Sequence, residues 1–287
     1  MTGSVTHTLD VPTARITYDV HAGPAGKPVL MMIGSPMEAA GFGALRRYFT
    51  DRTVVTYDPR GSARSSRTDG MAETTPAEHA DDVHRVIGAV GAAPVDLLAS
   101  SGGAVNALEL VSRHPGDVRT LVAHEPPAGP VLPDADRVLA ACRDIYETYH
   151  RGGTAPGMAK FIALTSHIGP LPADYADRPA PDPAIYGLPA EDDGSRDDPL
   201  LSQNMLACTA YRPDFAALAA APTRVVLAAG KESKGQLAAR AAAAIADRLG
   251  TELAIFPSHH GGFMDDEFGM SGEPAAFAAR LREILSA

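Results

Sequence analysis

The chain has 287 residues, of which 45% are hydrophobic, and its 25 Lys and Arg against 35 Asp and Glu give a formal net charge of −10. This length and apolar content suit one large domain with a sizeable core. The acidic balance argues against nucleic acid or an anionic membrane as a partner. We expect no signal peptide, because the N-terminus lacks a basic region followed by an apolar run. The apolar runs are too short to span a bilayer. The two cysteines indicate no disulfide framework, and we expect a cytoplasmic protein.

The N-terminal part of the chain predicts a sheet edge followed by buried strands. Residues Val5–Val11 and Ala14–Ala22 alternate apolar and polar side chains on either side of Pro12, which predicts an antiparallel pair of strands. The short, nearly continuous apolar runs at Pro28–Ile33 and Thr53–Tyr57 predict strands buried on both faces.

The stretch Val95–Pro115 carries the clearest local signal for chemistry. An apolar run breaks at a Ser-Ser-Gly-Gly segment and resumes with apolar residues at helical spacing. A strand that turns sharply into a helix with a serine at the turn is the nucleophile-elbow arrangement. The turn needs small residues two positions before and after the nucleophile, so Ser101 fits, with Ala99 and Gly103 around it. Ser100 does not fit, because a leucine stands two positions before it. The alternative interpretation is a Ser- and Gly-rich loop without chemistry.

The rest of the chain completes an alternating pattern. A strand predicted at Val118–Ala123 is followed by a long stretch without alternation, and the pattern then returns up to a final helix at Glu273–Ser286. Strands that alternate with helices predict an α/β fold with a doubly wound, mostly parallel sheet flanked by helices. We predict a core from residues 1–127 and 222–287 and a helical lid at 128–221. The lid would lie beyond the carboxyl ends of the strands, where such sheets bind ligands.

Four segments together carry a family likeness over nearly the whole chain. They are MMIGSPMEAAGF (31–42), VVTYDPRGSARSS (54–66), ASSGG (99–103) and FPSHHGGF (256–263). In this order and at this spacing, the chain resembles the α/β-hydrolase fold family. The four segments are similar to its oxyanion loop, its Asp-x-Arg-Gly segment, its nucleophile elbow and its histidine loop, respectively.

The resemblance implies a serine, histidine and carboxylate acting together. Ser101 takes the nucleophile's position and needs an adjacent base, because a hydroxyl is a poor nucleophile at its own pKa. The family pattern Pro-Gly-x-His-Gly places that base at His260, and His259 is expected to be a loop residue without a catalytic role. Two glutamates are candidates for the carboxylate that orients the histidine. We prefer Glu125, which follows the strand after the elbow, over Glu232, which precedes the family's commonest acid position by one residue.

The same resemblance assigns the oxyanion hole to two backbone N–H groups, those of Ser35 and Gly102, which would stabilise charge that develops in the transition state. Ile33 replaces the histidine that usually precedes the glycine of this loop. Asp58 and Arg60 are expected to brace a turn near the site rather than to take part in the reaction.

No metal or cofactor is indicated. His259, His260, Asp265 and Asp266 are metal-ligand types that lie close together in the chain, but their spacing matches no established zinc motif. We therefore expect neither a metal nor a cofactor at this loop or elsewhere.

A serine at the elbow, where some members of the family use aspartate, favours acyl transfer. We expect hydrolysis of an ester, thioester or lactone of a small to medium, partly apolar substrate, with Ser101 attacking the carbonyl and His260 taking the proton. The alternatives are a non-hydrolytic enzyme without cofactor (a peroxidase, lyase or acyltransferase) and a ligand-binding module without turnover. The expected partner is a small molecule in every case.

Overall fold

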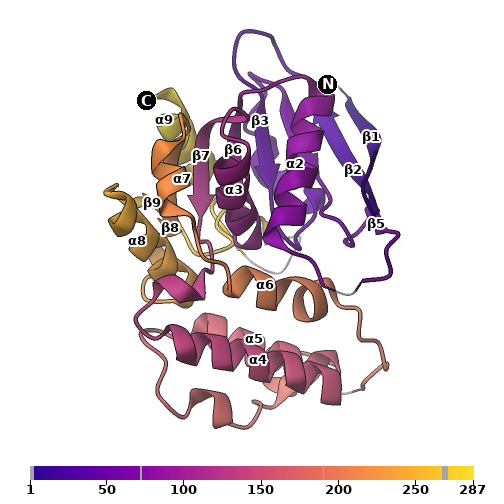
Figure 1. The fold of residues 1–287 in the computed structure, drawn as a ribbon, viewed down its shortest axis with the longest axis vertical. Coiled ribbons are helices and arrows are strands. Elements are labelled where there is room, and N and C mark those ends of the chain that lie inside the picture. Colours follow the sequence, from indigo (N-terminus) through magenta and orange to yellow (C-terminus); the bar gives the residue numbers. More distant parts are fainter. Residues whose placement is uncertain (1–2, 72, 190, 267–270) are drawn as a thin grey trace.

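A single β-sheet forms the centre of the protein (Figure 1). The computed structural model describes residues 3–71, 73–189, 191–266 and 271–287. Within them the sheet has nine strands in the order β1-β2-β4-β3-β6-β7-β8-β9, with β5 paired to β2. The strands are β1 (Ser4–Val11), β2 (Ala14–His21), β3 (Leu30–Ile33), β4 (Val54–Tyr57), β5 (Ser66–Arg67), β6 (Val95–Ser100), β7 (Val118–His124), β8 (Arg224–Gly230) and β9 (Ala254–Phe256).

The pairing of these strands confirms the predicted architecture. Strands β1 and β2 form the antiparallel pair at one edge, and β2 also runs antiparallel to β4. From β4 through β3, β6, β7 and β8 to β9, all neighbours are parallel. The sheet is therefore doubly wound and mostly parallel, and the carboxyl ends of its parallel strands meet at one edge.

Helices cover both faces of the sheet and extend beyond that edge. The helices are α1 (Gly43–Arg46), α2 (Pro76–Val90), α3 (Gly102–Arg113), α4 (Ala135–Gly152), α5 (Thr154–Ser166), α6 (Met205–Thr209), α7 (Phe215–Ala220), α8 (Leu237–Leu249) and α9 (Pro274–Ser286). Short 3₁₀ turns are η1 (Ala39–Phe42), η2 (Gly129–Val131), η3 (Tyr175–Asp177), η4 (Pro183–Tyr186) and η6 (Lys231–Ser233), and η5 (Pro199–Asn204) is a π-helix. None of the described helices has the length and apolar character needed to cross a bilayer.

Helix α2 shows how local sequence sets the ends of an element. Thr75 Oγ accepts a hydrogen bond from Glu78 N at 3.2 Å, and the Glu78 carboxylate accepts one from Thr75 N at 2.9 Å, which forms a capping box ahead of Pro76. The helix ends at Gly91, whose φ of 68° lies in the left-handed region that glycine adopts without strain. These signals set the residues at which α2 begins and ends.

Alternate residues of each central strand supply two hydrophobic cores. Met31 and Leu97 belong to the core that includes helices α2, α3 and α8. Met32 and Leu98, their neighbours in the chain, belong to a second core with the apolar faces of α1 and α9. Successive side chains of a strand point to opposite faces, so a strand that is covered on both faces must be apolar throughout.

The predicted lid stretch, residues 128–221, extends beyond the carboxyl edge of the sheet. Helices α4 and α5 pack against each other below the core in Figure 1, and α6 lies between them and α3. Helix α7 does not belong to this layer, because it packs against α3 and α8. The stretch thus begins as a separate helical layer and ends with one helix that joins the core layer.

Candidate active site

The turn between β6 and α3 holds Ser101 in an unusual backbone conformation. Its φ of 57° and ψ of −127° lie outside the common regions for residues with a side chain. Two hydrogen bonds fix the turn, from Ser101 N to His124 O and from Ala104 N to Ser101 O, both at 2.9 Å. Strand β7 on one side and the first turn of α3 on the other therefore hold this serine in place. Strained backbone of this kind is common at functional sites.

The residues after Ser101 must be glycines because the loop after β3 lies against them. A Cβ atom on Gly103 would lie 2.7 Å from Ile33 O, and one on Gly102 would lie 2.4 Å from Ser35 O. Both distances are far below van der Waals contact, and the obstructing atoms belong to the backbone. The close approach brings the end of β3 directly beside the first turn of α3.

We expect Gly103→Ala to lower the free energy of unfolding by about 1–3 kcal/mol, because its methyl group must displace the backbone of a core strand. Gly88→Ala is the matched control. Gly88 lies in helix α2 with no atom within 4 Å of an added Cβ, so this change should stabilise the protein by up to about 1 kcal/mol. Urea unfolding of both variants measures the two effects. Equal stability of the two variants would contradict the close-approach explanation.

Glu125 follows β7 at the same edge of the sheet and contacts His260. Its carboxylate is buried, with 1% of the residue exposed. One oxygen, Oε2, is hydrogen-bonded to His260 Nδ1, and the other, Oε1, accepts a hydrogen bond from Gly230 N at 2.8 Å. The backbone of Glu125 is held by a bond from its N–H to Ala228 O at 2.9 Å. Strands β7 and β8 thus fix both the backbone and the side chain of this glutamate.

The surroundings of Glu125 keep its carboxyl group ionised. Burial by itself would raise its pKa, but the hydrogen bond and charge of His260, together with the Gly230 N–H, lower the pKa to about 2. An ionised carboxylate can only accept a hydrogen bond, so Nδ1 of His260 is the ring nitrogen that carries the proton and donates. Nε2 is then the ring nitrogen that this contact leaves unoccupied.

Glu232, the other candidate acid, lies apart from this pair. It sits in the turn η6, with 51% of its side chain exposed, and its nearest charged partner is Lys231 at 3.8 Å. Its backbone N–H donates to Ser258 O at 3.1 Å. Within the described residues, no hydrogen bond or ion pair joins Glu232 to His260. The structure brings His260 together with Glu125.

The histidine loop presents His260 toward the site and holds His259 away from it. His260 keeps 41% of its side chain exposed. His259 has both ring nitrogens occupied by the loop, since Nδ1 accepts from Gly261 N at 3.0 Å and Nε2 lies 3.2 Å from Ser271 O. Among the described residues, Ser101 Oγ makes no hydrogen bond, so the serine–histidine link is open in this state. Such links often close only when substrate binds.

The loop after β3 places Ser35 beside the elbow, and of the two predicted bracing residues Asp58 supports that loop whereas Arg60 holds helix α2. Asp58 accepts a hydrogen bond from Ala39 N at 3.0 Å, which ties the loop to the end of β4. Arg60 forms a buried two-pronged ion pair with Asp82, at 2.7 and 2.8 Å. In the described part of the chain, the backbone N–H of Ser35 donates to no acceptor, and neither does that of Gly102.

Sequence reasoning missed three buried residues next to these groups: His124, Asn204 and Cys208. His124 precedes Glu125, and its Nδ1 lies 3.1 Å from Ser100 Oγ. Its position beside the predicted acid was a usable signal. Asn204 and Cys208 come from the lid segment, far along the chain, and no local pattern marked them.

The stability of the fold should decrease as the pH falls from about 6.5 to 4, because two histidines are buried as neutral rings. Burial lowers the pKa of His124 to about 4 and that of His79 to about 3. In this range the unfolded chain binds protons that the folded chain does not, so each histidine reduces the free energy of unfolding by up to about 1.4 kcal/mol per pH unit. Urea unfolding at several pH values should show a shallower slope for His124→Gln and His79→Gln. An unchanged slope in both variants would contradict this.

An open cavity of about 310 Å³ adjoins the oxyanion loop. Pro36, Met37 and Glu38 form one wall, directly after Ser35, and the lid residues Asp198–Leu200 form another. Its volume is at the lower end of the range for small-molecule sites. This space lies between the loop after β3 and residues Asp198–Leu200 of the predicted lid stretch, and neither Ser101 nor His260 lines it.

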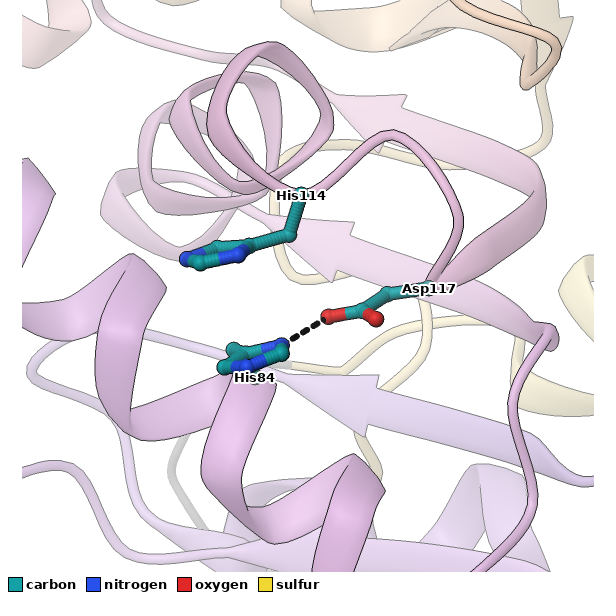
Figure 2. Close-up of side chains that lie close together, drawn as sticks. All are labelled: His84, His114 and Asp117. Carbon is teal, nitrogen blue, oxygen red and sulfur yellow. Dashed lines mark hydrogen bonds and ion pairs between the residues drawn. The ribbon is translucent and has the colours of Figure 1, made fainter.

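A second group of ionisable side chains lies at the other end of α3. Figure 2 shows His84, His114 and Asp117 close together, with their potential ligand atoms within 4.8 Å of one another. The two imidazole rings are stacked, with centroids 3.9 Å apart and planes inclined by 6°. Lone pairs of parallel stacked rings do not converge on one point. Moreover, His84 Nδ1 is occupied by Asp117 at 2.6 Å and His114 Nε2 by Asp81 at 3.0 Å. This arrangement fits histidines that are hydrogen-bonded to carboxylates and not a chelate.

The parallel sheet, the tight serine turn and the buried Glu125 carboxylate with its His260 partner, at the carboxyl edge of the sheet, define a hydrolase of the α/β class. A family model described as the alpha/beta hydrolase fold matches residues 21–180, more than half of the chain. The chain therefore belongs to the α/β-hydrolase fold family, as its sequence motifs predicted.

Individual relatives agree with this assignment. An uncharacterized hydrolase, YraK, from Bacillus subtilis is 28% identical over 266 residues, which cover 89% of each chain. Among solved structures, an α/β hydrolase from Sphaerobacter thermophilus matches with a TM-score of 0.66 at 17% identity, covering 98% of this chain and all of that one. A thermophilic esterase from Thermogutta terrifontis matches with a TM-score of 0.65 at 20% identity, covering 99% and 98%. At these identities the two structures show a shared fold.

Proposed function

We propose that this protein is a serine hydrolase that cleaves an ester, thioester or lactone through an acyl-enzyme intermediate. Ser101 is the nucleophile, His260 the general base and Glu125 the acid of the triad. The observation that carries the proposal is the buried Glu125 carboxylate on His260 Nδ1, at the same sheet edge as the serine turn. A buried charge is costly unless it is paired, and here its partner is a half-exposed histidine that faces the site.

The proposed cycle assigns a step to each group. Ser101 Oγ attacks the carbonyl carbon and transfers its proton to Nε2 of His260, whose positive charge Glu125 stabilises. The negative charge on the former carbonyl oxygen is stabilised by the backbone N–H groups of Ser35 and Gly102, both without a protein acceptor among the described residues. His260 then protonates the leaving group, and a water activated by the same histidine releases the acid.

The surroundings of the site favour a small to medium, partly apolar substrate. The open cavity of about 310 Å³ directly after Ser35 has Pro36, Met37 and Leu200 in its walls, together with the acidic Glu38 and Asp198. A polar or positively charged group on the substrate would be favoured near the two carboxylates, and an apolar group near the other walls.

Covalent labelling tests the proposal independently of the natural substrate. A fluorophosphonate probe reacts with activated serines, so we expect it to modify the folded protein once, on Ser101, as located by peptide mass spectrometry. Heat-unfolded protein is the control and should not react, since the activation depends on His260 and Glu125. A panel of p-nitrophenyl esters, thioesters and lactones then ranks the substrate classes. A folded protein that neither reacts with the probe nor hydrolyses any member of the panel would not be a serine hydrolase, which would leave a non-hydrolytic enzyme or a binding module.

A further inference from the structure

The π-helix η5 of the lid delivers one buried side chain to the oxyanion loop. This short helix and α6 lie between α4 and the core (Figure 1). Single-turn π-helices often occur at functional sites. Asn204, its last residue, is only 4% exposed, and its Nδ2 donates a hydrogen bond to Ser35 Oγ at 2.6 Å. The backbone beside it is anchored to the core, since Gln203 O accepts from Thr74 N at 3.2 Å.

A second contact agrees with this orientation of the Asn204 amide. Its oxygen, Oδ1, accepts a hydrogen bond from Cys208 Sγ at 2.9 Å, one turn further along the lid segment. The amide nitrogen consequently faces Ser35, and Ser35 Oγ acts as an acceptor in this contact. A hydroxyl has two acceptor sites and one proton to donate. The Ser35 hydroxyl proton thus stays available, and no described residue accepts it.

Three donors without a protein acceptor consequently gather at one place. They are the Ser35 hydroxyl, the Ser35 backbone N–H and the Gly102 backbone N–H. Ser35 and Gly102 lie side by side, since a Cβ atom built on Gly102 would be only 2.4 Å from Ser35 O. Ser35 is buried, and a buried donor that lacks a partner is unfavourable. An oxygen of the substrate that carries negative charge would satisfy all three.

We propose that Ser35 supplies its side-chain hydroxyl as a third oxyanion donor, and that Asn204 is the positioning residue that directs this hydroxyl toward the reacting oxygen. This inference rests on the proposed serine hydrolase function. It assigns the lid a part in transition-state stabilisation, because the group that orients the hydroxyl comes from η5 and not from the core. The position of the lid and the orientation of the third oxyanion donor are thereby linked through the hydrogen bond between Asn204 and Ser35.

Kinetics of four variants test the inference. Ser35→Ala keeps both backbone donors and should lower kcat by about 10²-fold with KM changed less than about threefold, as for the loss of one oxyanion donor. Asn204→Ala should lower kcat by about 10-fold, because the hydroxyl remains but is no longer directed. Since Asn204 acts through Ser35, the double variant should be no slower than Ser35→Ala. Ser35→Thr retains a hydroxyl and should recover most of the lost rate.

Ser202→Ala is the matched control on the same π-helix. Its hydroxyl donates only to Asp198 O within the helix, so the change should leave kcat unaltered. Thermal unfolding of every variant shows whether the fold is kept. If Asn204 merely supported the fold, its removal would lower the melting temperature and its effect on kcat would multiply with that of Ser35→Ala.

The rate of fluorophosphonate labelling provides a readout without a substrate, because the probe's P=O oxygen occupies the oxyanion position. Labelling of Ser101 in the unmodified protein supports the proposed function whatever the variants do. If Ser35→Ala then reacts as fast as the unmodified protein, the third donor is overturned and the proposed function stands. If the unmodified protein does not react, both are overturned. Slow labelling of Ser35→Ala and Asn204→Ala, with normal labelling of Ser202→Ala, is the expected result.

Discussion

Replacing Ser101 by alanine should lower kcat for a p-nitrophenyl short-chain ester by about 10⁴- to 10⁶-fold, the cost of losing a triad nucleophile. The physical reason is that the tight turn after β6 places the Ser101 hydroxyl at the start of α3, whereas the neighbouring Ser100 hydroxyl faces the interior. The backbone at Ser101, with φ of 57°, presents only this side chain at the start of α3. The fold should survive, since Ser101 Oγ makes no hydrogen bond with a described residue.

Ser100→Ala is the matched control for this experiment. Ser100 is the neighbouring serine, but it belongs to β6, and its hydroxyl faces His124 in the interior at 3.1 Å. We expect it to keep most of the activity and to lose a little stability. Full activity of Ser101→Ala, or loss of activity in Ser100→Ala alone, would refute the assignment of the nucleophile.

Replacing Glu125 by glutamine should lower kcat by about 10⁴-fold while the protein stays folded. In the glutamine variant the amide oxygen would still accept from Gly230 N, as Oε1 of the glutamate does at 2.8 Å. The amide nitrogen would then face Nδ1 of His260 and donate to it. That contact places the ring proton on Nε2, so the histidine could no longer accept a proton from Ser101.

Glu232→Gln is the control for this second prediction, because Glu232 is the other carboxylate that the sequence offers. Half of its side chain is exposed, and its ion pair with Lys231 spans 3.8 Å, so we expect little change in either rate or stability. Steady-state kinetics of both variants on the same ester decide between them. A large loss in Glu232→Gln with none in Glu125→Gln would reverse the assignment.

Much of the fold could be predicted because its signals are local. Apolar runs such as Leu30–Ile33 and Val54–Tyr57 must be covered on both faces, which only a parallel sheet between helices allows. The Ser101 turn was predictable for a similar reason, since its small neighbours follow from the space that a strand-to-helix turn leaves. The structure gives that requirement a concrete origin in the backbone of Ile33 and Ser35, which lies where side chains on Gly103 and Gly102 would be.

The choice between the two glutamates depended on the tertiary structure. Along the chain, Glu125 lies 135 residues from His260, and the sequence alone left Glu232 as an alternative. The parallel pairing of β7 with β8 brings Glu125, and not Glu232, to His260, because it holds Glu125 between Ala228 O and Gly230 N with its carboxylate on His260.

The contact between Asn204 and Ser35 is of the same kind, since it joins residues 169 positions apart through a π-helix that no sequence pattern marked. What the sequence determined by itself was thus the sheet and the serine at its edge, because strand burial and turn geometry act over a few neighbouring residues. Which distant side chains meet His260 and the loop after β3 was decided by strand register and by the packing of the predicted lid stretch.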